Sequence, residues 1–311
     1  MSAAVDTVDR YAVFGNPVAH SRSPAIHALF AEQTGQRLTY ERLLAPVDGF
    51  DAALQAFIAA GGRGANVTVP FKLDAHAAAT SLTARAAAAG AVNTLSFDGG
   101  RIIGDNTDGI GLVTDLLQNA GVVLAGKTIL LLGAGGAAQG VMLPLLQASP
   151  ALLVIANRTP AKAAAIAARF DQPAEANRDQ ARAIGAGTGI GKAGAGVDAA
   201  RRSLAVTPRV VACALAELDT PFDVIINATA ASLSDAVPVV SPVIFGSHTL
   251  AYDMMYASAP TAFMRLAAGH GAAVRDGLGM LVEQAAEAFF VWRGVRPQTA
   301  DVLAQVRAAL A

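Results

Sequence analysis

The sequence predicts an α/β fold, in which strands and helices alternate along the chain. Residues 129–132 are four consecutive apolar residues, which is typical of a strand buried on both faces of a parallel sheet. The glycine-rich segment 133–138 follows at once, and an apolar helical stretch comes after it. A second apolar run at 152–155 completes a strand–helix–strand unit. This order of strand, tight turn and helix N-terminus is that of a dinucleotide site, where free backbone N–H groups hold a pyrophosphate.

The residues after the second strand indicate which dinucleotide is bound. An NAD site usually has an acidic residue there, about 20 residues beyond the glycines, to bond the ribose 2′-hydroxyl. This chain has Asn157, Arg158 and Thr159 instead, with Lys162 one helical turn further on. Cations without a carboxylate suit a 2′-phosphate, so the sequence favours NADP over NAD. The alternative is a plain strand–helix–strand unit with solvated basic residues.

Composition excludes several classes of protein. The 311 residues suffice for two domains of ordinary size, and the apolar fraction of 53% indicates a globular protein. Lys+Arg 23 against Asp+Glu 24 leaves no excess charge for nucleic acid or an acidic membrane. The single cysteine, Cys213, rules out an intramolecular disulfide. With no signal peptide, and with glycines interrupting the apolar stretch 129–146, we expect a soluble cytoplasmic protein.

The N-terminal part begins with a strand over 11–15 and a helix from Ser23 to near Gly35. Ser23 is expected at the N-cap, with Pro24 at the first helical position. Capping alone would explain Ser23 but not Ser21. Two hydroxyls beside free N–H groups would make a cradle for a carboxylate.

A lysine follows a further strand, which is expected after the strands over 11–15 and 38–44. Residues 65–72 alternate between polar and apolar, so Asn66 and Thr68 point the same way. Lys72 lies just beyond the strand, where a helix begins, and is placed for proton transfer. The alternative is a solvated lysine on the first turn of a helix.

The next stretch predicts one helix over 73–89 and then a hairpin. Residues 91–97 and 101–104 flank Asp98-Gly99-Gly100, a strong hairpin signal. The second hairpin strand leads to Asp108, which opens a helix and, taken alone, would be a helix cap.

The C-terminal half continues the alternation, except for 171–203, which we interpret as a flexible surface insertion. Residues 185–192 within it superficially look like a phosphate loop, but the glycine and Ser/Thr spacing fails. Gln284 follows Met280 by four residues on a long helix, so both lie on one face. Strands are expected over 210–215, 222–229, 249–256 and 272–274, and helices over 261–269, 278–292 and 299–310.

Several ordered motifs resemble those of the shikimate dehydrogenase family, and the resemblance covers nearly the whole chain. Residues 15–24 are similar to the family's substrate-carboxylate motif, and 66–72 to its catalytic-lysine motif. Three further matches are at 90–94, 104–108 and 277–281.

The resemblance implies a two-domain enzyme whose terminal helices return to the first domain. A substrate-binding domain would comprise 1–108 and 278–311, and a doubly wound Rossmann-type NADP domain 109–277, with the insertion near 171–203. Ser21 and Ser23 would hold the substrate carboxylate. The substrate hydroxyls would contact Asn66, Thr68, Asn93, Asp108, Tyr256 and Gln284. The cofactor would contact Gly133, Ala134, Gly135, Gly136 and Ala137 through its pyrophosphate, Asn157, Arg158, Thr159 and Lys162 at its 2′-phosphate end, and Met254 and Gly277 beside the nicotinamide.

The implied reaction is the NADP-dependent, reversible reduction of 3-dehydroshikimate to shikimate, without a metal. Hydride reduction of a ketone leaves an alkoxide, which needs a proton within hydrogen-bond reach. Lys72 would donate it and Asp108 would orient Lys72, the two titrating as a coupled pair if they lie close. The partner is a small molecule, and a homodimer is left open.

Three departures from the family pattern leave alternatives open. Residues 227–232 lack the family's usual Ser and Gly, Ala84 replaces a common glutamate, and the insertion lies beside the adenosine end. The alternatives are a quinate or dual quinate/shikimate dehydrogenase, using NAD or NADP, and a non-catalytic NADP-binding regulator. A methyltransferase with a similar glycine turn is disfavoured by Arg158.

Overall fold

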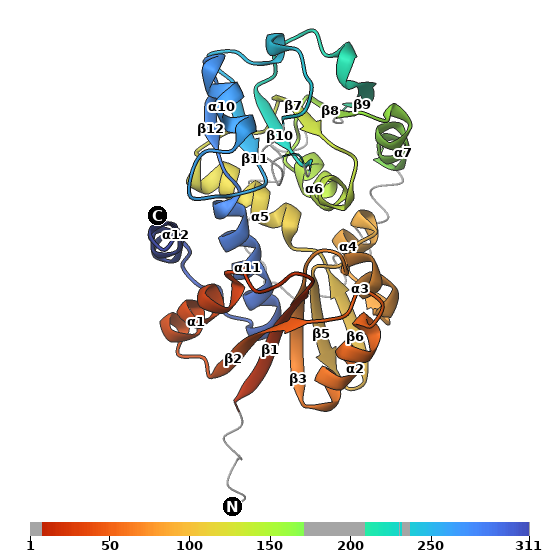
Figure 1. Cartoon of the computed structure of the whole chain (residues 1–311), viewed down its shortest axis with the longest axis vertical. Helices are drawn as coiled ribbons and strands as arrows, with labels where there is room; N and C mark the ends of the chain where they lie inside the picture. Colours follow the sequence, from red (N-terminus) through yellow and green to blue (C-terminus); the bar gives the residue numbers. More distant parts are fainter. Residues whose placement is uncertain (1–7, 171–208, 230, 232–236, 311) are drawn as a thin grey trace, which may run out of the picture. The chain divides into compact units, whose positions relative to one another are not determined.

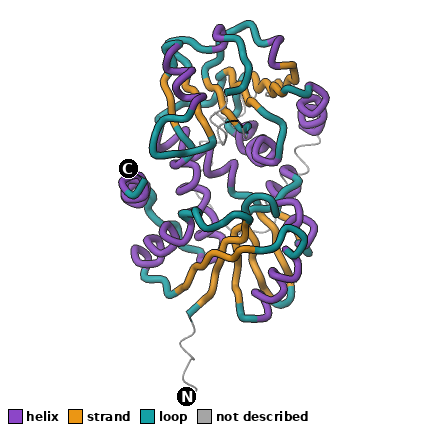
Figure 2. Tube along the Cα trace, viewed as in Figure 1, coloured by secondary structure: helices purple, strands orange, loops and turns teal. Residues whose placement is uncertain are grey.

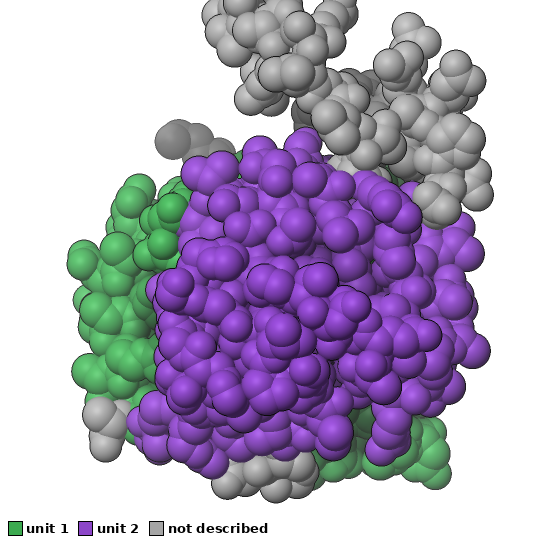
Figure 3. All heavy atoms as spheres, turned by 90° about the horizontal axis from the view of Figure 1, so that it is seen from above, with its two compact units in different colours: residues 1–121, 139–143, 277–311 green, residues 122–138, 144–276 purple. Residues whose placement is uncertain are grey.

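The computed structural model describes residues 8–170, 209–229, 231 and 237–310. The predicted insertion at 171–203 and the substituted positions Ala230 and Ser232 lie outside the described residues. The chain forms two compact units (Figure 3). Unit 1 comprises Met1–Gly121, Gln139–Leu143 and Gly277–Ala311, and unit 2 comprises Val122–Ala138 and Pro144–Asp276. The sequence-based boundary after Asp108 thus falls inside the first segment of unit 1.

Unit 1 is built on a mixed six-stranded sheet with the order β2-β1-β3-β5-β6-β4 (Figures 1 and 2). β1 lies between β2 and β3 and is parallel to both, whereas β5 is antiparallel to β3 and β6. The predicted hairpin is confirmed as β5 and β6. The strands are β1 (Asp9–Gly15), β2 (Leu38–Leu44), β3 (Gly62–Val67), β4 (Ser81–Leu82), β5 (Thr94–Asp98) and β6 (Arg101–Asp105).

Helices cover both faces of this sheet (Figure 1). On one face α2 and α3 bury Phe50, Phe57 and Phe71 against Phe14 of β1. On the other, Trp292 of α11 stacks on Tyr11 of β1 with 4.7 Å between ring centroids, so the C-terminal segment completes the core of unit 1. The helices are α1 (Ser23–Thr34), α2 (Phe50–Ala59), α3 (Lys72–Ala78), α4 (Ala84–Ala89), α5 (Asp108–Thr114) with a π-helical extension (Asp115–Asn119), α11 (Leu278–Arg293) and α12 (Ala300–Ala308).

The prediction of one helix over 73–89 is wrong. The chain leaves α3 after Ala78 and pairs as β4 with β6, and α4 then starts afresh with the Thr83 side chain accepting from Ala86 N. The alanine-rich composition favours a helix, but pairing with the sheet overrides that weak preference.

Two local predictions also need correction. Arg22, not Ser23, occupies the N-cap of α1, and no side chain caps that helix. β3 starts at Gly62 and ends at Val67, because Gly62 and Gly64 already pair with β1 and Gly64 also pairs with β5. Thr68 and Lys72 therefore lie beyond the strand.

Unit 2 contains six parallel strands in the order β12-β11-β10-β7-β8-β9, which are labelled in Figure 1. Since β7 is the first strand of this unit, the order is that of a doubly wound dinucleotide-binding fold, and the direction of winding reverses between β7 and β10. The strands are β7 (Thr128–Leu132), β8 (Leu152–Asn157), β9 (Arg209–Ala214), β10 (Val224–Asn227), β11 (Leu250–Asp253) and β12 (Ala273–Arg275). The helices are α6 (Gly136–Gln147), whose middle part Gln139–Leu143 is assigned to unit 1, α7 (Pro160–Phe170) and α10 (Ala262–Gly269), with 3₁₀ turns at Leu215–Glu217 and Pro242–Ile244.

One face of this sheet carries an apolar core. Leu130, Leu132 and Ile225 of the central strands pack with Phe263 and Ala267 of α10. No helix among the described residues is long and apolar enough to span a bilayer.

Candidate active site

A lysine and an aspartate that are 36 residues apart form an ion pair in unit 1. Lys72 at the start of α3 donates from Nζ to Asp108 Oδ2 at 2.6 Å. Asp108 is the first residue of α5 and is buried, whereas a quarter of the Lys72 side chain is exposed. Lys72 therefore keeps further N–H groups that can reach a ligand, beside a carboxylate that fixes its position.

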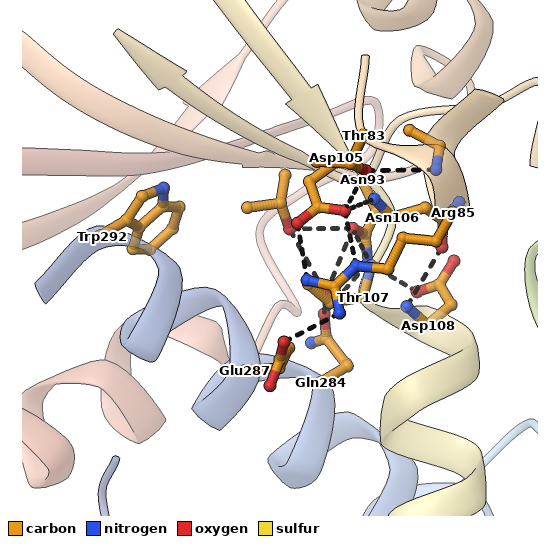
Figure 4. Close-up of polar contacts among 12 residues, drawn as sticks. Thr83, Arg85, Asn93, Asp105, Asn106, Thr107, Asp108, Gln284, Glu287 and Trp292 are labelled. Carbon is orange, nitrogen blue, oxygen red and sulfur yellow. Dashed lines mark hydrogen bonds and ion pairs between the residues drawn. The ribbon is translucent and has the colours of Figure 1, made fainter. Parts of the chain in front are cut away.

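Asn93 holds the other oxygen of Asp108 (Figure 4). Its Nδ2 donates to Asp108 Oδ1 at 2.8 Å and also lies 3.2 Å from Gln284 Oε1. Its Oδ1 accepts from the backbone N of Thr107 at 2.8 Å. Because a backbone N–H can only donate, this last bond fixes which way the Asn93 amide points.

Gln284 is oriented in the same manner. Its Nε2 donates to Leu281 O at 3.1 Å, so Oε1 is the atom directed at Asn93 and Thr107. The helices that carry Asp108 and Gln284 approach closely at Gly111, where an added Cβ would lie 2.6 Å from Gln284 Cβ. A glycine at position 111 is therefore needed for α5 and α11 to pack this closely against each other beside the site.

A second polar group gathers around Asn66. Its Nδ2 donates to Asn93 O at 3.2 Å and to Thr94 Oγ1 at 3.0 Å, and its Oδ1 accepts from the Tyr40 hydroxyl at 2.7 Å. Burial raises the pKa of Tyr40, and the neighbouring Ser23 side chain opposes that rise. With both Nδ2 hydrogens used, Asn66 has one acceptor position left for a ligand hydroxyl.

The two serines of the predicted carboxylate cradle lie together at the start of α1. Ser21 Oγ donates to Ser23 Oγ at 3.2 Å, and Ser23 N donates to Ser21 Oγ at 3.3 Å. Arg42 of β2 donates from Nε and Nη2 to Ser21 O at 3.0 and 2.6 Å. The guanidinium both fixes this loop and adds positive charge next to it, which suits an anionic group. Thr68 lies after β3, where its backbone N donates to Phe14 O at 2.9 Å.

The glycine turn of unit 2 follows β7 at the point where the strand order reverses. Gly133 has φ +111°, and an added Cβ would lie 3.1 Å from Ala228 O, so only glycine fits. Cβ atoms added at Gly135 and Gly136 would meet nothing within 4 Å. α6 starts at Gly136 without an acidic residue in its first turn, and the N-terminus of a helix suits an anionic pyrophosphate. The residues present therefore fit a dinucleotide.

The end of β8 carries the cationic group. Asn157 donates from Nδ2 to Thr159 O at 3.0 Å, and Arg158, Thr159 and Lys162 are exposed. With cations and no carboxylate in this segment, the arrangement fits a 2′-phosphate better than a free 2′-hydroxyl.

The remaining predicted cofactor and substrate residues are divided between the units. Met254 and Tyr256 follow β11 in unit 2, where buried Asp253 accepts from Met255 N at 3.1 Å and from Thr261 Oγ1 at 2.6 Å. Gly277 is the N-cap of α11 and belongs to unit 1.

Sequence reasoning missed Tyr40, Arg42 and Arg85, the last of which pairs with Asp105 at 2.6 Å. Tyr40 and Arg42 lie on β2, an edge strand whose alternation reveals only which face each side chain takes. Arg85 follows Ala84 in the stretch predicted to be one long helix, so it was not distinguished from a solvated residue. Arg85 lies one residue after the start of α4 and close to the capping residue Thr83. This position is the one local signal in the sequence that distinguishes Arg85 from a solvated arginine.

The strand order and the glycine turn define a protein with a Rossmann-type dinucleotide-binding unit, and unit 1 adds the Lys72–Asp108 ion pair. Family models agree with this class. Residues 13–95 match the shikimate dehydrogenase substrate binding domain, 115–185 match shikimate / quinate 5-dehydrogenase, and 277–307 match the shikimate 5'-dehydrogenase C-terminal domain.

Whole-chain comparisons identify the particular family. The shikimate dehydrogenase (NADP(+)) of Herminiimonas arsenicoxydans is 58% identical over 97% of this chain and 98% of that protein. The solved structure of an Ael1 enzyme from Pseudomonas putida has TM-score 0.81 and 41% identity, covering 96% of this chain and 97% of that one. The shikimate 5-dehydrogenase of Thermus thermophilus, solved with NADP(H) and shikimate, has TM-score 0.77 and 31% identity, covering 97% and 100%. The chain belongs to the shikimate dehydrogenase family.

Proposed function

We propose that this protein catalyses the NADP-dependent, reversible reduction of 3-dehydroshikimate to shikimate. The observation that carries the proposal is the Lys72–Asp108 pair, 2.6 Å apart, among amides whose orientation is fixed. Relatives that are 52–58% identical over nearly the whole chain are named NADP-dependent shikimate dehydrogenases, which supports the same substrate and cofactor. We assign substrate binding to the segments 1–108 and 278–311, and NADP binding to 109–277.

The chain's own residues supply the proton and the orientation. NADPH supplies the hydride to the carbonyl carbon when it is bound. The Lys72 ammonium donates a hydrogen bond to the carbonyl oxygen and transfers a proton as negative charge develops there. Asp108 keeps Lys72 in position, and in the oxidation direction Lys72 takes the proton from the reacting hydroxyl.

The polarity of the site suits a ligand that is rich in hydroxyl groups. Asn66 Oδ1 and Gln284 Oε1 are held as acceptors, while Lys72 supplies donors. Ser21 and Ser23, with Arg42 behind Ser21, would receive the carboxylate. A polyhydroxylated carboxylic acid matches both groups, with its hydroxyls at Asn66, Gln284 and Lys72 and its carboxylate at the two serines.

The decisive experiment is a steady-state assay with shikimate and quinate, each with NADP and NAD. We expect the highest kcat/KM with shikimate and NADP. A higher kcat/KM with quinate or with NAD would instead identify a quinate or dual quinate/shikimate dehydrogenase. No turnover despite tight NADPH binding would indicate a non-catalytic regulator.

Lys72→Ala tests the role of the pair. Turnover should fall by about 10²-fold or more, the usual contribution of a general acid or base, while the Kd for shikimate changes by a modest factor. Lys127→Ala is the matched control, because Lys127 also pairs with an aspartate, Asp223, at 3.0 Å in unit 2. Turnover of Lys72→Ala equal to that of wild type would refute the assignment.

A further inference from the structure

Asp105 belongs to the motif at 104–108, and its carboxylate lies in a largely buried ion-pair network with Arg85 (Figure 4). Arg85 of α4 donates from Nε to Asp105 Oδ1 and from Nη2 to Asp105 Oδ2, both at 2.6 Å. Thr83 Oγ1 and the backbone N of Asn106 also donate to Asp105 Oδ1, at 2.6 and 2.7 Å. Each of these contacts on the carboxylate comes from a donor, and 6% of the side chain is exposed.

The third arm of the same guanidinium reaches another part of the chain. Arg85 Nη1 donates to Glu287 Oε1 at 2.8 Å, although the two residues are 202 positions apart. Glu287 lies on α11, three residues after Gln284, so both occupy neighbouring positions on one side of that helix. Arg296 Nη2 donates to the other oxygen, Glu287 Oε2, at 2.7 Å. Arg85 is thus bonded simultaneously to the end of β6 and to α11.

These two attachment points carry the residues of the candidate active site. Asp105 O accepts from Asn93 N at 3.0 Å, and Asn106 Oδ1 accepts from Asp108 N at 3.1 Å. A displacement of Asp105 would therefore move Asn93 and Asp108 together. A displacement of Glu287 would move Gln284.

We propose that Arg85 is a positioning residue: it holds Asn93 and Asp108 at the end of β6 in register with Gln284 on α11. The inference rests on the proposed function, because the proposed function is what assigns Asn93, Asp108 and Gln284 to substrate binding. A planar guanidinium has five N–H donors in a fixed fork and can bind one carboxylate through two nitrogens while reaching a second with the third. A lysine ammonium keeps the charge but cannot reproduce that geometry.

The test compares Arg85→Lys with Arg293→Lys. Arg293 is a matched control because it also lies on α11 and pairs with an aspartate of unit 1, Asp9, while its other bonds, to Gln36 and Tyr11, lie outside the candidate site. Both variants should lower Tm. Only Arg85→Lys should lower kcat by about tenfold or more and raise the KM for shikimate by about fivefold, with the KM for NADP within about twofold of wild type.

Glu287→Gln separates the two arms of Arg85. It removes the negative charge of Glu287 and leaves the Arg85–Asp105 arm intact, so the KM for shikimate should rise several-fold while kcat stays within about threefold. If Arg85→Lys does not fold, this variant decides: a KM unchanged within about twofold overturns the proposal. For a folded Arg85→Lys, kcat and KM both within about twofold of wild type overturn it as well.

A readout independent of turnover distinguishes this proposal from the proposed function. Side-chain amide ¹H–¹⁵N resonances of Asn93 and Gln284 should shift in Arg85→Lys and remain in place in Arg293→Lys. If wild type turns over neither acid, the proposed function fails, and these resonances still test Arg85. Resonances unchanged in Arg85→Lys would refute its positioning role.

Discussion

Acid should destabilise unit 1 through one buried histidine. His27 of α1 is fully buried and its ring stacks on Tyr40 at 4.3 Å between centroids, with Phe30, Phe289 and Trp292 around it. Among the described residues, neither ring nitrogen has a hydrogen-bond partner. Burial lowers the pKa of His27 to about 3, an effect that the neighbouring Asn66 side chain opposes without reversing.

The sign and size of the effect follow from proton linkage. The unfolded chain binds a proton on His27 below about pH 6.5, whereas the folded chain stays neutral there down to about pH 3. The unfolded state binds more protons in this range, so the free energy of unfolding falls as the pH falls. From about pH 7 to about pH 5 this one group removes about 2 kcal/mol. For a unit of this size, that corresponds to a decrease in Tm of about 4–8 °C.

His27→Phe isolates this contribution, because it keeps an aromatic ring in the stack and removes the titrating nitrogens. Thermal unfolding of wild type and variant between about pH 5 and about pH 7.5 gives the two slopes. We expect the variant to lose about 2 kcal/mol less than wild type over this range, whatever its stability at neutral pH. His270→Phe is the control for replacing a stacked imidazole by a phenyl ring, since His270 also stacks on a phenylalanine, Phe245, but is exposed. Equal slopes for wild type and His27→Phe would refute the reasoning.

Two further substitutions test the close packing of α5 on α11 and the role of the cationic segment after β8 in NADP binding. Gly111→Ala should destabilise the protein by about 1–3 kcal/mol in thermal unfolding and raise the KM for shikimate, because the new Cβ would lie 2.6 Å from Gln284 Cβ. Gly269→Ala, whose Cβ meets nothing within 4 Å, should leave that KM unchanged, and equal effects of the two would contradict the close-packing argument. Arg158→Gln should raise the KM for NADP about tenfold, the loss of one charge-assisted contact, and leave the KM for NAD unchanged. Arg209→Gln is the control, because Arg209 starts β9 beside the first residue of β8, whereas Arg158 follows the last residue of β8. It should change neither the KM for NADP nor the KM for NAD. If Arg158→Gln also leaves both KM values unchanged, the assignment of the 2′-phosphate fails.

The sequence predicted the doubly wound unit well because its signals are local. The apolar run before Gly133, the glycine turn and the following helix lie close together in the chain, and β7 and α6 were found where this pattern places them. The residues at the end of β8 could likewise be located by counting from the turn. What could not be predicted locally was the break after Ala78, because it depends on pairing with β6, further along the chain.

The candidate site divides in the same way. Lys72 and Asp108 belong to motifs that a reader of the sequence can recognise, and the structure brings them into contact. Arg85 and Glu287 belong to no such motif, and 202 positions separate them, so no spacing rule relates them. Their relation follows only from the return of α11 to the sheet of unit 1.

Backbone groups beside α5 and on α11 determine which side-chain atoms of the site donate hydrogen bonds and which accept them. The backbone N of Thr107 can only donate, so it fixes Asn93 Oδ1 as an acceptor and directs Asn93 Nδ2 to Asp108 and Gln284. Leu281 O can only accept, so it fixes Gln284 Nε2 as a donor and leaves Oε1 facing Asn93. Two backbone groups from distant parts of the chain thus determine the orientation of both amides before any ligand binds. Under the proposed function, a site fixed in this way would have little reorganisation left to undergo as charge develops on a substrate oxygen beside Lys72. Fixed dipoles contribute most to catalysis under that condition.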